Sequence, residues 1–392
     1  MRSFSTGSDT HEQRDVLHDR EGDPMGGDGI EGLLRDRLLI MVNDRSAIGL
    51  LPHIDGNAGG LLLTGVDAAS RCRNIRNSYP DTVVAVDYGG HEHRVATVDR
   101  PFGYQAADGW HALDFSGLEE VLNGQLANKA AFAVTPTCFI PPDEDGDARV
   151  LRAVITQANR LERTDTVVLL PCSYRWLRDE SLLHLVEAVR ASRHPVALIM
   201  QHYKDPLERV GVAEGLRVLC RSCPRLLLWR TDLAAFDALA HGALGTAVGV
   251  TAMLRHGMDP RRKGRGWRPY PVVLVRELLK YHRVEVLQNW FTRVDPWTCG
   301  CAVCEGAELS RFSESNADVR ESQWHNTCEL YALHDELISA DAGRDRLEWW
   351  RQILDDAVAR HHLLTSDLGE EVAHPPVLHY WQRASPPAVP MP

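Results

Sequence analysis

No apolar run in this chain approaches the roughly 18 residues that a membrane-spanning helix needs. The first residues are polar and acidic, so the sequence lacks the apolar core of a secretion signal. Hydrophobic residues make up 44% of the 392 residues and charged residues 25%, which excludes wholesale disorder and a collagen-like fibre. We therefore predict a globular, cytoplasmic protein.

The chain also lacks an excess of positive charge. It holds 43 basic and 54 acidic residues, a net charge of −11, which is not the composition of a general nucleic-acid coat protein. One segment differs, because residues 255–268 hold six basic residues and one acid. This segment is either a surface for phosphates, with Trp267 stacking on a base, or a solvated loop. The candidate phosphate contacts are Arg255, Arg261, Arg262, Lys263, Arg265 and Arg268.

Nine cysteines without a secretion signal indicate thiols or a metal site rather than a disulfide framework. Cys299, Cys301 and Cys304 lie within six residues, and His325 follows after 20 intervening residues. Zinc prefers thiolate and imidazole ligands, and the short spacers allow a loop to wrap around one ion. We predict one structural zinc ion held by these four residues, with no open position. Cys328, one helical turn after His325, is the alternative fourth ligand.

Short apolar runs of five to seven residues recur along the first two thirds of the chain. This is the length of a buried parallel strand, and amphipathic helical patterns separate most of the runs. Eight strands alternating with helices predict an α/β protein with a (β/α)8 TIM barrel. The link over residues 43–59 has little helical signal, and the alternative is an open doubly wound sheet. The predicted strands are 38–42, 60–64, 82–87, 131–135, 166–171, 196–201, 225–230 and 245–251.

Changes in composition divide the chain into four predicted parts. Residues 1–30 form a disordered acidic tail, residues 31–284 the barrel, residues 285–364 a zinc-binding helical subdomain and residues 365–392 a Pro-rich tail. We expect this last tail to be extended from His374 onward, with Tyr380 and Trp381 docked on the body. Because active sites of such barrels lie at the carboxyl ends of the strands, residues that end strands are the first functional candidates.

The CxCxxC cluster followed by His325 on a helix resembles the zinc motif of the tRNA-guanine transglycosylases. The helix pattern of residues 324–334 (WHNTCELYALH) is similar to the His-led helix of that family. Upstream, the segments PRLLL, DALAHG and LRHG, between residues 224 and 257, resemble the family's "PRYLMG … GxD … TRxxRxG" stretch. Residues 86–90 (VDYGG) resemble its "DSGG" motif. The resemblance covers about residues 38–360 and implies a (β/α)8 barrel with a zinc subdomain near the C-terminus.

Members of that family exchange a purine base in a nucleic acid for a 7-deazaguanine. Breaking the N-glycosidic bond leaves positive charge on the sugar, so a carboxylate must stabilise that charge or attack the sugar. A second carboxylate assists proton transfer or recognises the base. Asp87 matches the first carboxylate, and Gly89 and Gly90 allow a ligand to approach the backbone closely. The alternative for Asp87 is a carboxylate that caps the following turn.

The second carboxylate departs from the family pattern. The family's nucleophile lies a few residues after the glycine that corresponds to Gly242, but residues 242–250 contain no acid. Thr246 or Ala247 occupies that place, and Thr246 and Gly249 are candidates for substrate binding. Asp232, at the end of another predicted strand, is a possible substitute, although Asp before a helix is typical of an N-cap.

Two further groups follow predicted strands. Gln201 and His202 could hydrogen-bond the edge of a base. Residues 91–93 (HEH) could bind a metal or protonate a leaving base, but an HxH sequence in a loop is more often exposed to solvent. Neither a Walker loop nor a dinucleotide-binding glycine motif is present in the sequence, so a nucleoside triphosphate or dinucleotide cofactor is not expected.

The predicted function is a transglycosylase that exchanges a guanine in DNA or tRNA for a 7-deazaguanine base. The departures from the tRNA-enzyme motifs favour a diverged branch that modifies DNA. The alternatives are a non-catalytic subunit or nucleic-acid-binding module that has lost the nucleophile, and a zinc-stabilised hydrolase of free nucleosides. The resemblance also implies a homodimer or a partner subunit bound through the zinc subdomain. Trp290, Trp297 and Trp324 could serve such an interface or belong to the core.

Overall fold

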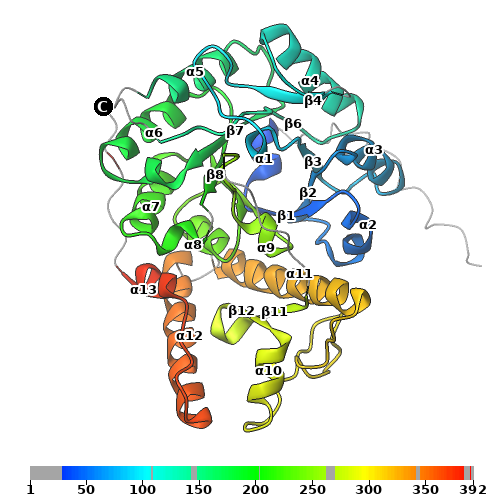
Figure 1. Ribbon diagram of the computed structural model, residues 1–392, viewed down its shortest axis with the longest axis vertical. Helices are drawn as coiled ribbons and strands as arrows, with labels where there is room; N and C mark the ends of the chain where they lie inside the picture. Colours follow the sequence, from blue (N-terminus) through cyan, green and yellow to red (C-terminus); the bar gives the residue numbers. More distant parts are fainter. Residues whose placement is uncertain are drawn as a thin grey trace, which may run out of the picture.

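The structure, a computed structural model, describes residues 29–106, 109–142, 148–202, 204–261, 270–340, 345–383 and 389. Eight parallel strands form one sheet that curls into a nearly closed barrel surrounded by helices (Figure 1). All eight predicted strands are present, with ends within two residues of those expected. They are β1 Arg37–Asn43, β2 Gly59–Thr64, β3 Val84–Asp87, β6 Ala133–Val134, β7 Thr166–Ser173, β8 Val196–Gln201, β9 Leu226–Thr231 and β10 Gly245–Gly249.

The order of the strands decides between a barrel and an open sheet. It runs β3-β2-β1-β10-β9-β8-β7-β6, so the first and last strands of the fold, β1 and β10, are hydrogen-bonded neighbours. The two ends of the sheet also meet, because the N–H of Ala131, just before β6, donates to the carbonyl of Val84 in β3 at 2.8 Å. The predicted (β/α)8 barrel is confirmed, and the open doubly wound alternative is wrong.

The two faces of each strand pack against different layers, as the period of two along a strand requires. One face fills the inside of the barrel with apolar side chains. The short helix α1 Gly29–Leu34 adds Ile30 and Leu34 to this interior cluster. Since α1 directly precedes β1, it closes the amino-terminal end of the barrel and leaves the opposite end to the polar residues described below. Interior members from the strands include Leu39, Met41, Leu62, Ala85, Leu169, Ile199, Trp229 and Ala247.

The outer face of the sheet is covered by amphipathic helices. In α5, for example, Leu151, Val154, Ile155 and Ala158 are buried, which is the spacing of a single helical face. The weakly helical link after β1 forms only the short turns α2 Ala47–Leu50 and η1 Leu51–His53. A hairpin, β4 Gly103–Ala106 and β5 Gly109–Ala112, precedes α4. The remaining barrel helices are α3 Ala68–Ser78, α4 Phe115–Ala127, α5 Arg149–Ala158, α6 Asp179–Ala191, α7 Val212–Ser222, α8 Ala234–Ala240 and α9 Ala252–Arg255.

After the barrel the chain builds a separate apolar core, which we call the C-terminal module. Trp290, Phe312, Leu364 and Leu368 belong to this core. In Figure 1 the module lies below the barrel, with the long helix α11 between them. No helix in the described residues is both long and apolar enough to cross a membrane. The module comprises β11 Val272–Val275, β12 Lys280–Arg283, α10 Val284–Trp290, α11 Asn316–Ser339 and α12 Arg346–Leu368.

Both predicted tails need correction where the structure describes them. The C-terminal segment is not simply extended, because Pro376–Gln382 forms the helix α13, and α12 continues to Leu368, beyond the predicted boundary at 364. Trp381 is docked as expected and is 2% exposed. At the other end, residues 29 and 30 belong to α1 rather than to a tail, and the rest of the predicted acidic tail lies outside the described residues.

Candidate functional site

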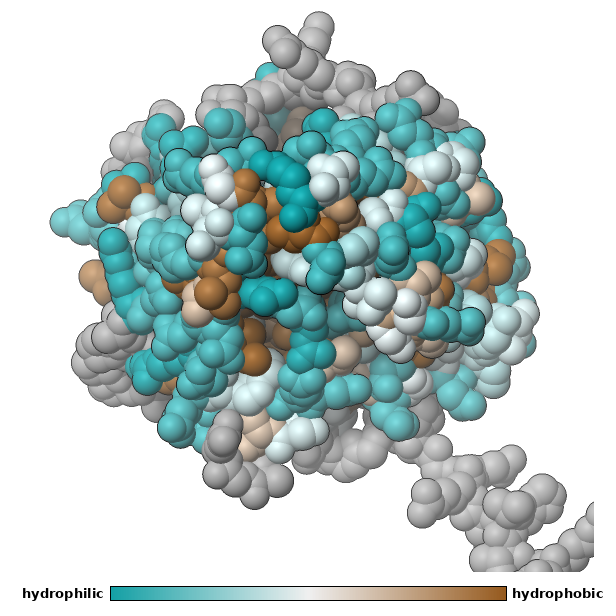
Figure 2. Space-filling view, turned by 90° about the horizontal axis from the view of Figure 1, so that it is seen from below, coloured by the Kyte–Doolittle hydropathy of each residue, from teal (hydrophilic) through white to brown (hydrophobic). Residues whose placement is uncertain are grey.

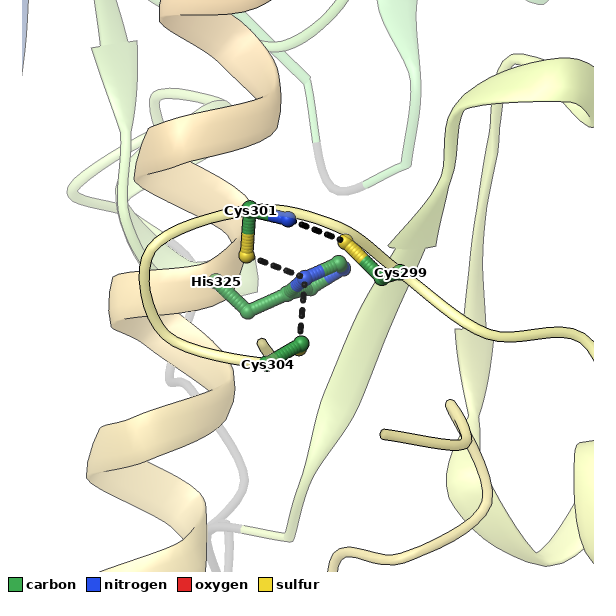
Figure 3. A group of neighbouring side chains, drawn as sticks. All are labelled: Cys299, Cys301, Cys304 and His325. Carbon is green, nitrogen blue, oxygen red and sulfur yellow. Dashed lines mark hydrogen bonds between the residues drawn. The ribbon is translucent and has the colours of Figure 1, made fainter. Parts of the chain in front are cut away.

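The three clustered cysteines and His325 converge beside α11. Cys299, Cys301 and Cys304 lie in the loop between α10 and α11, which folds back on itself as the N–H of Gly306 donates to the carbonyl of Cys299 at 2.8 Å. His325 projects from α11 into this loop (Figure 3). The ligand atoms of the four residues all lie within 4.8 Å of one another. The predicted group is therefore assembled and could hold one metal ion.

The ring of His325 is oriented for binding a metal through Nδ1. Nδ1 lies 3.6 Å from the sulfur of Cys301 and 3.4 Å from that of Cys304. Nε2 lies 3.1 Å from the carbonyl oxygen of Leu274, which can only accept a hydrogen bond, so the proton belongs on Nε2. Asn326 secures α11 to the same strand by accepting from the N–H of Leu274 at 2.6 Å. A ligand histidine fixed by its second nitrogen, with three thiols around it, fits a closed tetrahedral site.

The charges of the cluster also favour metal binding. Hydrogen bonding, chiefly with Cys299, lowers the pKa of the Cys301 thiol, while the reciprocal hydrogen bond raises that of Cys299. One thiolate is thus stabilised before a metal arrives, and the metal would displace the remaining thiol protons. Cys328 lies outside the group of four, with its sulfur 3.8 Å from Nδ1 of His53. The geometry favours His325 over Cys328 as the fourth ligand.

The three tryptophans considered for a subunit interface have different surroundings. Trp290 is 5% exposed and belongs to the core of the module. Trp324 stacks on His53 with a centroid distance of 5.3 Å. Trp297 lines a groove of about 1090 Å³ that also borders the cysteine cluster. Seen from below, the end of the molecule formed by the module is mostly hydrophilic, with hydrophobic side chains in a hollow near its centre (Figure 2). Contacts between subunits through this module stay a prediction. Trp290 cannot contribute to them, because it belongs to the core.

The second group of candidates lies at the carboxyl-terminal mouth of the barrel, where Asp87 ends β3. Its side chain is 1% exposed; Oδ1 accepts from the N–H of Gly89 at 2.8 Å, and Oδ2 lies 3.2 Å from Nε2 of His91. Burial raises the pKa of Asp87, but the contacts with His91 and Gly89 and the charge of Arg230 outweigh it, so the pKa lies below its ordinary value. Asp87 is therefore an ionised carboxylate with a fixed orientation at neutral pH.

The solvent-exposed loop predicted for residues 91–93 is wrong for His91. This ring is fully buried, in the short turn η2 Gly90–Glu92 that directly follows Asp87. The amide of Gln201, at the end of β8, lies 3.0 Å from Nδ1 of the same ring. The sequence did hold one indication of this contact. His91 follows Asp87 by four residues, and one helical turn brings residues at this spacing to the same side.

An ion pair that the sequence did not predict crosses the same mouth. The guanidinium of Arg230, in β9, pairs with the carboxylate of Glu92 and also donates to the carbonyl of Met253 at 3.1 Å. Burial raises the pKa of Glu92, but the charge of Arg230 more than compensates and leaves this pKa lowered. Arg230 has a φ of +51° and lies where the register of β9 against β10 shifts. Such a bulge changes the direction in which a side chain points. No pattern in the sequence predicts this bulge.

Asp232, the predicted substitute acid, lies just beyond β9. Its Oδ1 accepts from the N–H of Ala234 at 3.1 Å in the turn that leads into α8, although the N-cap position itself is Leu233, and its Oδ2 lies 3.7 Å from Nε2 of His256. Asp205, in the loop after β8, accepts from the N–H of Leu207 at 2.8 Å. Burial, together with the charge of Asp232, raises the pKa of Asp205 to about 8. The mouth thus holds a second carboxyl group that keeps its proton near neutral pH, and the sequence analysis had missed it.

Arg230 connects the two groups of acids electrostatically. Its positive charge lowers the pKa of Asp87 on one side and that of His256 on the other. The negative charge of Asp232 acts on both His256 and Asp205. The two predicted catalytic acids, Asp87 and Asp232, therefore belong to one network of charges at the carboxyl ends of β3, β8 and β9.

Three residues predicted to contact a substrate, Gly89, Gly249 and Thr246, do not present a side chain to the mouth of the barrel. Gly89 has a φ of +69° and supports the turn after Asp87. Gly249 is covered by the chain, because a Cβ there would lie 2.2 Å from the backbone of Leu254. Thr246 precedes Ala247, which belongs to the interior cluster. Since successive side chains of a strand point to opposite faces, Thr246 points to the outer layer and away from the mouth.

Other predicted contacts lie around the rim. Gly90 is packed against a neighbouring segment, since a Cβ there would lie 3.0 Å from the carbonyl oxygen of Gly103. His202 is half-buried, and its ring meets that of Tyr174 edge-on at 4.8 Å. Of the six predicted contacts, Gln201 is the one whose side chain contacts the Asp87 group, through the ring of His91.

The basic segment is described only in part. Arg255 is 7% exposed; its guanidinium lies 3.3 Å from the centroid of the Tyr281 ring, and its Nε donates to the carbonyl of Gly249 at 3.2 Å. It is thus packed under the loop rather than presented to phosphates. Arg261 is exposed and pairs with Asp259 at 2.6 Å. The predicted contacts outside the described residues are Arg262, Lys263, Arg265 and Arg268.

Comparison with protein-family models finds no match to this chain. Comparison with curated proteins finds no match either. The resemblance to the tRNA-guanine transglycosylases therefore depends on the quoted motifs, and the family is not established for this chain.

Proposed function

We propose that this protein is a base-exchanging transglycosylase that replaces a guanine in a nucleic acid by a 7-deazaguanine. The observation that carries the proposal is the ionised, doubly hydrogen-bonded carboxylate of Asp87 at the carboxyl-terminal mouth of the barrel. A fixed anion at that position suits a reaction that develops positive charge on a sugar. The protonated carboxyl group of Asp205 supplies the complementary group, a proton donor near neutral pH.

The proposed reaction has two steps. As the bond between the sugar C1′ and the guanine nitrogen breaks, an oxygen of Asp87 bonds to C1′, and the departing base takes a proton from Asp205. The incoming base then attacks C1′, releases Asp87 and returns its own proton to the ionised Asp205. Asp232 beside it holds the second carboxyl group in its protonated form until it is needed. No net oxidation occurs, and both carboxyl groups return to their initial state.

We propose zinc as the metal of the Cys299, Cys301, Cys304 and His325 group. Its part in the reaction is structural, because four protein ligands leave no position for a substrate. The nucleic acid is DNA or tRNA, with the sequence departures favouring DNA. The exposed part of the basic segment, represented among described residues by Arg261, supports a polymeric substrate.

The test is to incubate the zinc-loaded protein with isotopically labelled 7-deazaguanine bases, separately with duplex DNA, single-stranded DNA and tRNA. After digestion to nucleosides, mass spectrometry detects a labelled 7-deazaguanosine or its deoxy form. A product in one polymer alone identifies the substrate. If no polymer yields product while the protein binds zinc and is folded, the proposed activity is wrong for the isolated chain.

Replacing Asp87 by Asn gives the first mechanistic prediction. We expect the exchange rate to fall about 1,000-fold, since the amide can neither attack nor stabilise the sugar cation as an anion does. Asp295→Asn, an exposed position in the C-terminal module, is the matched control and should keep the wild-type rate. Affinity for the polymer and zinc content should be unchanged in both variants, and both should remain folded. An Asp87→Asn protein with more than a tenth of the wild-type rate would rule Asp87 out as the nucleophile.

The second candidate is a nucleic-acid-binding protein without transfer activity. The absence of an acid in residues 242–250 and the buried position of Arg255 favour it. Such a protein would bind a polymer with a strong dependence on salt concentration and give no exchange in the assay above. A hydrolase of free nucleosides would instead release guanine from guanosine without any polymer present.

A further inference from the structure

We propose that Gln201 and His91 form a relay that positions Asp87, in which the amide of Gln201 donates to Nδ1 of His91 and keeps that nitrogen without a proton. This inference rests on the proposed function only where it concerns turnover, because the protonation pattern itself can be observed without any activity. His91 is a positioning residue, since it acts on the carboxylate rather than on a substrate.

The hydrogen bonds determine the direction of the relay. The amide nitrogen of Gln201 lies 3.0 Å from Nδ1 of His91 and 3.5 Å from the backbone carbonyl oxygen of the same residue. A flipped amide would bring two oxygen atoms together at that carbonyl, so the nitrogen belongs there. Nδ1 is therefore the acceptor, the ring proton is on Nε2, and Nε2 donates to Oδ2 of Asp87 at 3.2 Å.

Charged and polar groups from three strands surround His91. Asp87 faces it from β3 and Gln201 from β8, while Glu92, the other nearby acid, is occupied by Arg230 from β9. His93, two residues along the chain, is the remaining titratable neighbour whose charge is coupled to the ring. In the described residues no carboxylate contacts Nδ1, whose partner is the amide of Gln201.

Packing holds the relay in place. His91 is fully buried, and the turn that carries it lies so close to its neighbours that a side chain at Gly90 would press against backbone oxygens. A Cβ at Gly90 would lie 3.0 Å from the carbonyl oxygen of Gly103 and 3.1 Å from that of Pro136. The ring therefore has little room to turn away from Asp87.

The relay leaves one polar atom for a ligand. The side-chain oxygen of Gln201 is buried and has no hydrogen-bond partner among the described residues. An unpaired buried acceptor is costly unless a donor completes it. An N–H group of a purine base entering the mouth is a donor of the required kind. Gln201 would thus couple the presence of the base to the orientation of Asp87.

The experiment is a long-range ¹H–¹⁵N NMR measurement of the ring nitrogens in the full-length, zinc-loaded, ¹⁵N-labelled protein. The signals of His91 are those lost in His91→Gln. In the wild type we expect a protonated Nε2 and an unprotonated Nδ1. In Gln201→Leu the donor to Nδ1 is gone, so part of the rings should carry a proton on both nitrogens beside the anionic Asp87, and in Gln201→Glu the new carboxylate should place a proton on both nitrogens in all of them. Gln352→Leu, on the exposed face of α12, is the control and should leave the His91 signals unchanged.

Two results would overturn the relay: a proton on Nδ1 of His91 in the wild type, or an Nδ1 that stays fully unprotonated in a folded Gln201→Leu protein. If exchange is detected, Gln201→Leu should lower kcat about 10- to 100-fold, as is typical for loss of an outer-sphere partner, and Gln201→Asn should recover part of it. The expected tautomers without any exchange would support the relay and contradict the proposed function, so the two failures are distinguishable.

Discussion

The metal centre and the barrel mouth are assembled in opposite ways. The metal centre takes three ligands from a stretch of six residues and the fourth from the next helix. The mouth takes its charged and polar groups from the ends of three strands and from the loops beyond them, between Asp87 and His256. We expect the first to depend on a bound ion for its cohesion, whereas the second depends on the strand register and a buried ion pair. We therefore expect metal removal to disrupt the first region, and loss of buried charged or polar contacts to disrupt the second.

The helix α12 joins the barrel to the C-terminal module that carries the metal-ligand group. Near its start, the indole of Trp350 donates to the carboxylate of Asp237 in the barrel helix α8 at 3.0 Å. Near its end, Leu364 and Leu368 belong to the core of the C-terminal module. The barrel and the C-terminal module thus share one helix. The sharpest tests therefore perturb one of these parts and observe the other.

Removal of the metal should have the largest effect. Structural zinc sites bind with apparent free energies of about 10–16 kcal/mol, most of which is available to stabilise the fold around them. We expect a chelator, or Cys304→Ala, to release about one metal ion per chain and to unfold the loop of residues 299–309. Hydrogen exchange followed by mass spectrometry should show lost protection in that loop and in α11, with β8 and β9 still protected. Elemental analysis gives the identity of the metal.

The matched control is Cys223→Ala, which removes a buried thiol far along the chain from the cluster. It should keep the metal and the protection of the loop. If metal removal increased hydrogen exchange in the barrel strands as much as in the loop, the two regions would form one cooperative unit. The proposed difference between them would then be wrong.

The joint between the regions gives the next largest effect. Arg217 is 2% exposed and donates to both carboxylate oxygens of Asp237 at 2.7 and 2.9 Å, and to the carbonyl of Trp381 at 2.6 Å. Breaking a buried pair leaves an uncompensated charge and costs about 3–5 kcal/mol. Arg217→Met should therefore lower the free energy of unfolding by that amount, measured by urea denaturation, and release α13 from the barrel.

The chain offers a matched control for this variant. Arg383 pairs with Glu214 at 3.2 Å, but its side chain is 61% exposed. Exposed pairs contribute about 0–1 kcal/mol, so Arg383→Met should be close to neutral. Metal content should be unchanged in both proteins. An Arg217→Met protein that lost its metal would show that the joint also supports the metal centre.

The same contrast explains what the sequence could and could not reveal. The cysteine spacing and the eight apolar runs are local patterns, and both the ligand group and the barrel were predicted from them. The contact between His91 and Gln201 joins residues 110 positions apart, and its existence depends on the curvature of the whole sheet. The direction of Arg230 depends on a shift in strand register. Asp87 could be predicted because it ends a strand in a motif, but its partners could not.

The smallest expected effect concerns Asp205, and it is specific to the mouth. Its pKa is raised from an ordinary 3.8 to about 8, by burial and by the charge of Asp232. Between about pH 4 and pH 8 the unfolded chain loses this proton while the folded chain keeps it, so the stability due to this group falls as the pH rises. Asp205→Asn cannot ionise and should escape this loss. We expect its melting temperature, relative to the wild type, to rise by a few degrees between pH 4.5 and pH 8.

Two further variants identify the cause of this pH dependence. Asp295→Asn removes one exposed acid and reports the general effect of net charge on the same pH series. Asp232→Asn removes the neighbouring charge, so Asp205 should titrate at a lower pH and the pH-dependent difference should shrink. A difference for Asp205→Asn that is the same at both pH values would mean that Asp205 is ionised in the folded protein at neutral pH. The mouth would then hold two anions instead of an acid and an anion, and the proton donor of the proposed exchange would have to be sought elsewhere.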